Sequence, residues 1–281
     1  MLEVRNLTKK FEKFSLDNIS FKLEPGYIMG FIGPNGAGKS TTIKLIMNLL
    51  KKDSGEIKVF GMDNVKYEKE IKQRIGFVYE EPYYYENLTL RQMKNIIAPF
   101  YTEWDDKQFT KYIGDFGLDL DKKIKELSKG MKTKFSLALA LSHNADLIIM
   151  DEPTSGLDPV FRREILDILY NIIQDEKKSI FFSTHITTDL EKIADYITFI
   201  DKGKIVFSKS IDEVFDSYRV VKGGNDLLDW HIRQEFIGLR TTKVGFEGLT
   251  DNPEKFQKIL GDQIIVERAS LEDIMFYTIR G

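Results

Sequence analysis

The sequence predicts an α/β fold built on a mainly parallel sheet. Short apolar runs of the buried-strand kind alternate with stretches of helical periodicity in the second half of the chain. The strand candidates are 147–150, 179–183 and 196–200, and the helices between them are 162–174 and 188–194. Strands that alternate with helices need crossover connections, which cover the faces of a parallel sheet with helices.

The same pattern occurs near the N-terminus. The apolar run Tyr27–Ile32 leads directly into a glycine-rich loop, and apolar residues at helical spacing follow from Thr41 to Leu50. The glycines therefore lie between a strand and a helix. Further strands are expected at 2–7, 14–23 and 56–60.

The middle of the chain and its tail differ from this core. Residues 86–144 show helical periodicity in three stretches, 90–100, 106–116 and 130–142. A break is expected near Lys222-Gly223-Gly224. Beyond it we expect strands at 243–246 and 264–268, and a closing helix from Ser270 with Asp273 completing a capping box.

Composition narrows the classes of protein. The 281 residues, 42% of them hydrophobic and 30% charged, suit one large domain or one domain with a small appendage. No uncharged apolar run reaches the roughly 18 residues of a membrane span, and no signal peptide is apparent. The absence of cysteine excludes disulfides and thiolate chemistry and fits a cytosolic location. A net charge of −3 disfavours nucleic-acid binding.

A phosphate-binding loop is the first functional motif. Gly33, Gly38, Lys39 and Ser40 match G-x-x-x-x-G-K-[ST]. Glycines let the backbone curl so that N–H groups point inward at phosphate oxygens, and the following helix presents its positive end. Lys39 is expected to reach the β- and γ-phosphates, and Ser40 to offer its hydroxyl to Mg²⁺.

A pair of acids follows the predicted strand 147–150. Asp151 and Glu152 should lie at the carboxyl edge of the sheet, where ligands of open α/β sheets bind. Asp151 suits Mg²⁺, and Glu152 suits polarising the water that attacks the γ-phosphate. Taken alone, the pair could also be an ordinary solvated strand end.

From this point the sequence resembles the ATP-binding subunits of ABC transporters over roughly residues 1–215. Five motifs in the family's order carry the resemblance: the phosphate loop 33–40, Leu127-Ser128-Lys129-Gly130-Met131 (similar to the LSGGQ signature), Asp151-Glu152, Ser155-Gly156-Leu157-Asp158 (similar to the D-loop) and Ser183-Thr184-His185 (similar to the switch histidine). The resemblance implies a P-loop NTPase fold of ABC type, with an ATP-binding core, an antiparallel β subdomain and a helical subdomain at about 86–145. Residues 216–281 would then form a small α+β accessory domain.

The resemblance also implies a mechanism. Two subunits would pair head to tail, and Ser128 and Gly130 would contact the γ-phosphate held by the partner's phosphate loop. His185 would sense the γ-phosphate, Asp158 would shape the interface, and Phe11 would stack on adenine, unless it is an ordinary edge aromatic. The expected catalytic residues are Lys39, Glu152 and His185; the expected ATP contacts are Phe11, Gly33, Asn35, Gly36, Gly38, Lys39, Ser40, Thr41, Ser128, Gly130 and Asp158; the expected Mg²⁺ ligands are Ser40, Glu80 and Asp151.

Three positions depart from the family pattern. Glu80, or else Glu81, takes the place of a glutamine, and an ionised glutamate accepts hydrogen bonds but cannot donate them. We hypothesise that Glu80 keeps the metal and coupling role at an altered hydrolysis rate. Met131 replaces a glutamine. Lys129 replaces a glycine, and it either adds positive charge near the partner's phosphate or is an ordinary solvated residue at a helix start.

The resemblance further implies separate transmembrane permease subunits, with this chain peripheral at the cytoplasmic face of the membrane as a homodimer or heterodimer. The aromatic run Pro82-Tyr83-Tyr84-Tyr85 could anchor that contact or pack inside the helical subdomain. The signature variant and the tail are similar to those of bacterial ABC-2-type exporters. Alternatives are a soluble ABC ATPase acting on a macromolecule, or a nucleotide-switched module with little turnover, against which Glu152 argues. The transported substrate and the role of the tail stay open.

Overall fold

The computed structural model describes residues 1–81 and 83–280, which divide by their internal contacts into two compact units. The first unit comprises residues 1–186 and 193–208, and the second comprises residues 187–192 and those from Lys209 onward. The second unit thus begins seven residues before the expected boundary at residue 216 and takes in a short segment from earlier in the chain.

One sheet of the first unit is antiparallel. Alternate residues of its strands face the core, as the two-residue period of a strand requires; in β2 these are Leu16, Ile19, Phe21 and Leu23, after a local irregularity. The strand order is β2-β1-β4-β5, with β1 Leu2–Lys10, β2 Ser15–Leu23, β4 Ser54–Val59 and β5 Met62–Asp63. This sheet shares one hydrophobic core with the larger sheet beside it.

The larger sheet contains the predicted parallel strands. Its order is β10-β9-β3-β8-β7-β6, with β3 Ile28–Ile32, β6 Ile75–Val78, β7 Leu147–Asp151, β8 Ser179–Thr184, β9 Tyr196–Asp201 and β10 Lys204–Ser210. The β9-β3, β3-β8, β8-β7 and β7-β6 pairs are parallel. Strands β3 and β8 are buried along their whole length, as strands covered on both faces are. The carboxyl ends of β3, β8 and β7 therefore lie side by side.

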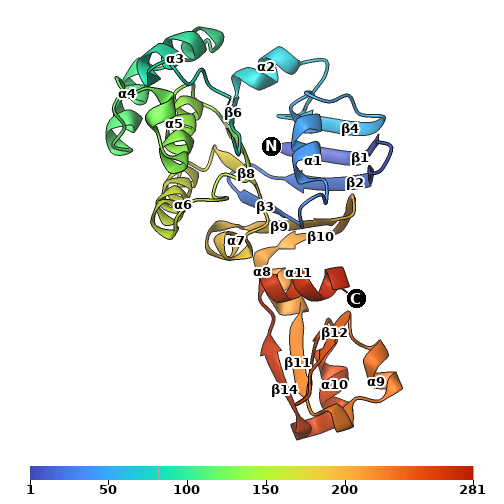
Figure 1. Cartoon of the computed structure of the whole chain (residues 1–281). Helices are drawn as coiled ribbons and strands as arrows, with labels where there is room; N and C mark the ends of the chain where they lie inside the picture. Colours follow the sequence, from blue (N-terminus) through green and yellow to red (C-terminus); the bar gives the residue numbers. More distant parts are fainter. Residues whose placement is uncertain (82, 281) are drawn as a thin grey trace. The chain divides into compact units, whose positions relative to one another are not determined.

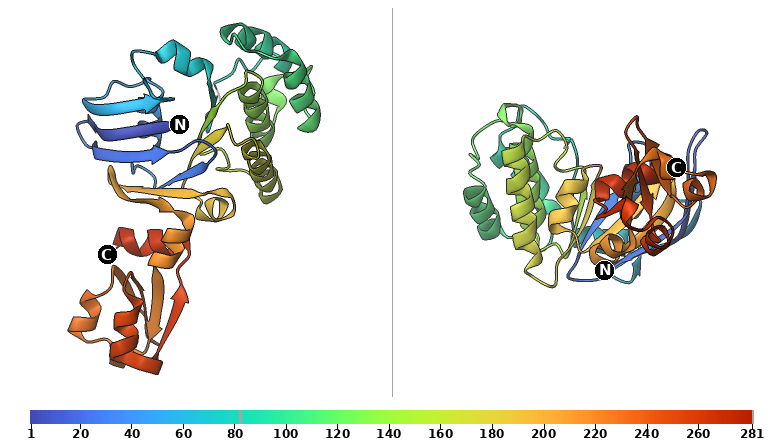
Figure 2. Two further views of the ribbon diagram at one scale, coloured as in Figure 1. Left: turned by 180° about the vertical axis from the view of Figure 1, so that it is seen from behind. Right: turned by 90° about the horizontal axis from the view of Figure 1, so that it is seen from below.

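Helices complete the first unit. Their bounds are α1 Lys39–Ile46, α2 Glu68–Gln73, α3 Leu90–Ile97, α4 Asp106–Asp115, α5 Lys129–Leu141 and α6 Pro159–Ile173. Side-chain caps begin four of them, from Thr89, Asp105, Ser128 and Asp158. Both views show α3 to α6 gathered on the side of the large sheet away from β1, β2 and β4 (Figures 1 and 2). Helices α3, α4 and α5 share their own hydrophobic core, centred on Phe135 and Phe109.

The second unit is an antiparallel sheet with helices. Its strands are β11 Arg219–Gly223, β12 Gly238–Thr241, β13 Phe246–Thr250 and β14 Ile264–Arg268, in the order β12-β13-β11-β14. Its helices are α7 Thr187–Ile193 (apart from its last residue), α8 Ile211–Ser217, α9 Trp230–Gln234, α10 Pro253–Leu260 and α11 Leu271–Arg280. With α9 and α10 as its two crossovers, the run β11 to β14 has the topology of the split β-α-β motif known from ferredoxin-like folds.

Two expectations for the tail were wrong. The break near Lys222 to Gly224 is instead the end of β11, an interior strand of the sheet. Gly223 is not there for flexibility, because a Cβ at that position would lie 2.9 Å from the ring of Phe246. The strand predicted at 243–246 begins only at Phe246, because residues before it turn the hairpin. Strand β14 and the capping box at Ser270 and Asp273 are confirmed.

Strand β6 and helix α5 approach each other closely at Gly76. A Cβ built on Gly76 would lie 2.8 Å from the Cβ of Ala140 and 3.0 Å from its carbonyl oxygen. We expect Gly76→Ala to lower the free energy of unfolding by about 1–3 kcal/mol, because the backbone of α5 would have to move. Urea unfolding measures it. Gly114→Ala in α4 is the control: a Cβ there meets nothing within 4 Å, so this change should be neutral or stabilising. Equal effects of the two changes would contradict the packing.

A buried histidine lies where α5 ends. His143 stacks on Tyr101, with ring centroids 3.8 Å apart, and its Nδ1 lies 3.2 Å from the carbonyl oxygen of Gln73. Burial lowers the pKa of His143 from 6.5 to about 4. Between pH 6.5 and about 4, the unfolded chain therefore protonates His143 whereas the folded chain keeps it neutral. Stability from the neutral ring is present above pH 6.5 and is lost as the pH falls through this window.

We expect the chain to lose roughly 3 kcal/mol of unfolding free energy at this single site between pH 6.5 and 4. In His143→Gln, which cannot take up the proton, the pH dependence of the urea midpoint should be shallower across that range. The exposed His231 provides the control as His231→Gln, whose profile should match the parent. A profile of His143→Gln that overlays the parent would show that His143 does not titrate in this way.

Candidate functional site

The phosphate loop follows β3 as predicted, and α1 begins at Lys39. Gly36 and Gly38 adopt left-handed backbone angles, with φ of 80° and 115°, which explains the need for glycine at both. The Lys39 ammonium folds back over the loop and donates to the carbonyl oxygens of Gly33 at 2.7 Å and Pro34 at 3.2 Å. The loop therefore surrounds its own lysine with acceptors.

Asp151 joins the loop to the neighbouring strand ends. It is the last residue of β7, and its Oδ1 accepts hydrogen bonds from Ser183 Oγ at 2.7 Å and Ser40 Oγ at 3.2 Å. Ser183 lies opposite Asp151 in the parallel β7-β8 register, so the strand pairing itself creates the first contact. Ser183 was expected only as part of the motif Ser183-Thr184-His185, with no role of its own.

Glu152 is the centre of the site. Its Oε1 lies 3.2 Å from Lys39 Nζ, and its Oε2 lies 2.8 Å from Nδ1 of His185 and accepts from the His185 backbone N–H at 3.3 Å. Its backbone is left-handed, with φ of 49°, an uncommon conformation for a side chain of this size. The Glu152 N–H donates to the Ser183 carbonyl oxygen at 3.0 Å, which fixes this turn. All three expected catalytic residues therefore meet.

These groups open onto a cavity of about 700 Å³, a size typical of small-molecule sites. Most of the expected phosphate-site residues line it. The lining residues are Lys13, Phe14, Asn35, Gly36, Gly38, Lys39, Ser40, Thr41, Glu80, Glu152, Ser155 and His185.

The aromatic at the cavity is not the one expected. Phe14 lines the cavity, whereas Phe11 does not; Phe11 is 45% exposed and its ring centroid lies 6.2 Å from that of Phe14. Phe14 packs against the loop, since a Cβ on Gly38 would lie 3.0 Å from its ring. Lys13 and Ser155 also line the cavity without having been predicted. Only proximity to Phe11 in the sequence could have suggested Lys13 and Phe14.

Four other expected ATP contacts are not part of the cavity lining: Gly33, whose carbonyl oxygen accepts from Lys39, and Ser128, Gly130 and Asp158. Ser128 caps α5 and accepts from the Met131 N–H at 3.2 Å, as its predicted place at the helix start requires. Gly130 faces α6, where a Cβ would lie 2.8 Å from the Phe161 ring. Asp158 caps α6 through the Val160 and Phe161 N–H groups. The chain does not bring Ser128, Gly130 or Asp158 to its own phosphate loop.

Comparison with known proteins identifies the family. A family model described as "ABC transporter" matches residues 16–155. The bacitracin transport ATP-binding protein BcrA of Bacillus licheniformis is 35% identical over 209 residues, which cover 73% of this chain and 68% of that protein. A fluoroquinolones export ATP-binding protein of Mycobacterium tuberculosis is 31% identical over 98% of this chain and 91% of its own length.

A solved structure agrees with these relatives. The ATP-binding subunit of an ABC transporter is 28% identical, covers 76% of this chain and 91% of its own, and has a TM-score of 0.69. Within residues 1–81 and 83–280, no helix is both long and apolar enough to cross a bilayer. The fold of this chain is thus that of an ABC ATP-binding subunit, and the converging lysine, acids and histidine are its candidate nucleotide site. This chain belongs to the family of ABC transporter ATP-binding proteins, and it binds and hydrolyses ATP.

Proposed function

We propose that this chain is one half of a head-to-tail dimer that powers an ABC-type exporter through separate membrane subunits. One observation is the main support for the dimer. Lys39, Glu152 and His185 converge on the cavity. Ser128 and Gly130 are not part of its lining. A second copy that brings its Ser128 and Gly130 to this cavity would complete the phosphate site. The names of the relatives, which include bacitracin transport and fluoroquinolone export, support an exporter.

The contacts of Lys39 suggest how ATP engages the site. Lys39 is held by the Gly33 and Pro34 carbonyl oxygens and by Glu152. The β- and γ-phosphates of ATP carry more charge and would replace these acceptors. Glu152 is then released from Lys39 while His185 still holds its other oxygen. ATP binding would in this way activate the carboxylate that hydrolysis needs.

Glu152 would then act on the attacking water. As the water oxygen bonds to the γ-phosphorus, the bond from that phosphorus to the β–γ bridging oxygen breaks and ADP leaves with the electron pair. The proton of the water passes to Glu152. The His185 backbone N–H and ring nitrogen keep the carboxylate in place, and its half-exposed ring is available to sense the γ-phosphate.

The oxygen donors near the loop fit Mg²⁺. Ser40 Oγ and Asp151 Oδ1 lie 3.2 Å apart, and hydroxyl and carboxylate oxygens are ligands that Mg²⁺ prefers. Glu80, on the cavity wall, is a third candidate ligand. In the described chain, no three acidic or histidine side chains cluster to form a metal site alone, so phosphate and water oxygens would supply the rest. A bound Mg²⁺ would neutralise charge on the phosphates.

Removing the Glu152 charge tests the catalytic assignment. We expect Glu152→Gln to bind ATP but to lose hydrolysis by at least about 100-fold, because an amide cannot accept the proton. Phosphate release and ATP affinity measure the two parts. Glu103→Gln, at an exposed loop position, should match the parent. Unchanged turnover in Glu152→Gln would exclude Glu152 as the base. A parent without turnover even beside its membrane partner would favour a nucleotide-switched module.

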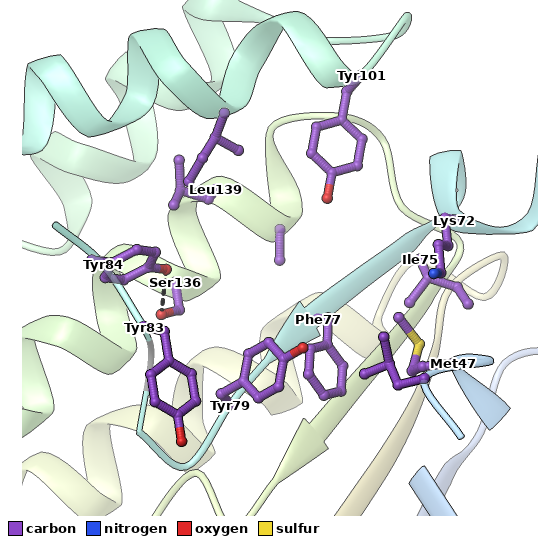
Figure 3. Close-up of a pocket in the computed structure, with 13 residues that line it drawn as sticks. Met47, Lys72, Ile75, Phe77, Tyr79, Tyr83, Tyr84, Tyr101, Ser136 and Leu139 are labelled. Atoms are coloured by element: carbon purple, nitrogen blue, oxygen red, sulfur yellow. Dashed lines mark hydrogen bonds between the residues drawn. The ribbon is translucent and has the colours of Figure 1, made fainter. Parts of the chain in front are cut away.

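A groove beside the nucleotide site suits the membrane partner. It has a volume of about 500 Å³ and lies between β6 and the segment after it on one side and α5 on the other (Figure 3). Its walls are aromatic and apolar, with Phe77, Tyr79, Tyr83, Tyr101 and Leu139 among them. Aromatic-rich grooves favour an amphipathic helix of a partner. We propose that a cytoplasmic helix of the permease docks there and holds this chain at the membrane.

Two tyrosines of the aromatic run, Tyr83 and Tyr84, differ in burial. Tyr84 packs against the helical core, and its hydroxyl lies 2.8 Å from Ser136 Oγ (Figure 3). Its ring centroid lies 5.4 Å from that of Phe135. Its burial raises the pKa of Tyr84 to about 12. A Tyr84→Ala test of docking would therefore damage the fold. Tyr83 is 91% exposed and lines the groove, and Pro82 lies outside the described residues.

We expect Tyr83→Ala to reduce recovery of the membrane subunit by about tenfold, the loss of an aromatic interface anchor. Co-purification from detergent-solubilised membranes, quantified by mass spectrometry, measures it, and ATP affinity should stay that of the parent. Tyr170→Ala is the matched control, since Tyr170 is 56% exposed on α6 and does not line the groove. Full recovery with Tyr83→Ala would contradict docking at this groove.

A further inference from the structure

Two of the three departures from the family pattern contact each other. Lys129, in the signature segment, places its Nζ 3.9 Å from Oε1 of Glu80, at the expected glutamine position. The two side chains come from segments far apart in the sequence and are 34% and 47% exposed. Lys129, which replaces a glycine, and Glu80, which replaces a glutamine, thus form an ion pair within one chain.

The position of Lys129 is not explained by helix stability. It is the first residue of α5, and a cation at a helix N-terminus is disfavoured by the helix dipole. No acidic residue occupies the first turn of α5, and within the described residues the ion-pair partner of Lys129 is Glu80. Lys129 also extends toward the D-loop, where a Cβ on Gly156 would lie 3.5 Å from its Nζ.

Glu80 stands between two hollows. It lines the 700 Å³ nucleotide cavity and also a neighbouring pocket of about 480 Å³ whose wall includes Lys129. The partner of Lys129 therefore determines whether a carboxylate at the wall of the nucleotide cavity is paired. The single carboxylate of Glu80 can therefore either act in the nucleotide cavity or pair with Lys129 of the signature segment.

We propose that Lys129 exchanges Glu80 for the γ-phosphate bound by the second copy when the dimer closes, so that Glu80 is an internal competitor of ATP. This inference rests on the proposed head-to-tail dimer. The exposed pair is weak enough to open, and a phosphate offers more charge and more acceptor oxygens than a carboxylate. Closure would then leave the Glu80 carboxylate, which already lines its own nucleotide cavity, without Lys129 as its partner. A chain with the uncharged glutamine and glycine of the family pattern at positions 80 and 129 would lack this competition.

The test is a double-mutant cycle on ATP-driven dimerisation in the Glu152→Gln background. Analytical ultracentrifugation measures the ATP concentration at which half of the chain is dimeric. Glu80→Gln should lower the ATP concentration at half-dimerisation by about two- to fivefold, because the competitor is gone. Lys129→Ala should raise it. Combined with Lys129→Ala, Glu80→Gln should have no further effect. Lys129→Arg keeps the charge and should preserve the response to Glu80→Gln.

Two controls distinguish this exchange from a structural role of Glu80: the dependence on ionic strength, and a second ion pair near α5. The effect of Glu80→Gln should shrink as ionic strength rises, because exposed charges are screened. Lys132, on α5, and Glu86, in the segment before α3, form a second pair, also at 3.9 Å. Glu86→Gln should leave dimerisation unchanged with or without Lys132→Ala, which controls for loss of any surface charge near α5.

The outcomes are distinct. If Glu80→Gln shifts dimerisation equally with and without Lys129→Ala, the exchange is overturned and the dimer stands. If the Glu152→Gln chain stays monomeric at saturating ATP and Mg²⁺, the head-to-tail dimer is overturned, and the exchange with it.

Discussion

The buried ion pair between Lys39 and Glu152 is the contact that holds the candidate nucleotide site together before ATP binds. The two side chains are only 6% and 8% exposed, and one follows the β3 loop while the other follows β7. A buried charge without a partner costs several kcal/mol, so each residue holds the other in place. The pair thereby pins the phosphate loop to the strand ends. It also helps hold Glu152 in its left-handed conformation, which has a cost that only surrounding contacts sustain.

Helix α5 connects the parts of the first unit that nucleotide and partner would use. Its 13 residues extend about 20 Å and begin at the signature segment. Further along, Ser136 and Leu139 line the partner groove and Ala140 packs against Gly76 of β6. A displacement of the groove wall therefore reaches the signature segment through one rigid element, without a loop between them.

The sequence could predict what short-range patterns determine. Glycines at fixed spacing need left-handed backbone at Gly36 and Gly38, and acids that follow a buried strand must lie at its end, so the loop and Asp151-Glu152 were placed correctly. Contacts between distant segments were not predictable. The pair of Glu80 and Lys129 has no local signal, and Phe14 has only its nearness to Phe11 in the sequence. Glycine next to a strand misled the prediction at Gly223, where the Phe246 ring, not a turn, requires it.

The division of the chain at α7 limits how the tail could be gained or lost. Residues Thr187–Lys192 follow His185 and Ile186 directly, yet they belong by contact to the second unit. There Glu191 accepts a hydrogen bond from the Leu271 N–H at 2.8 Å. A truncation at residue 208 would remove this hydrogen bond from a segment that starts two residues after His185. Removal of the tail would therefore also take away this contact of α7.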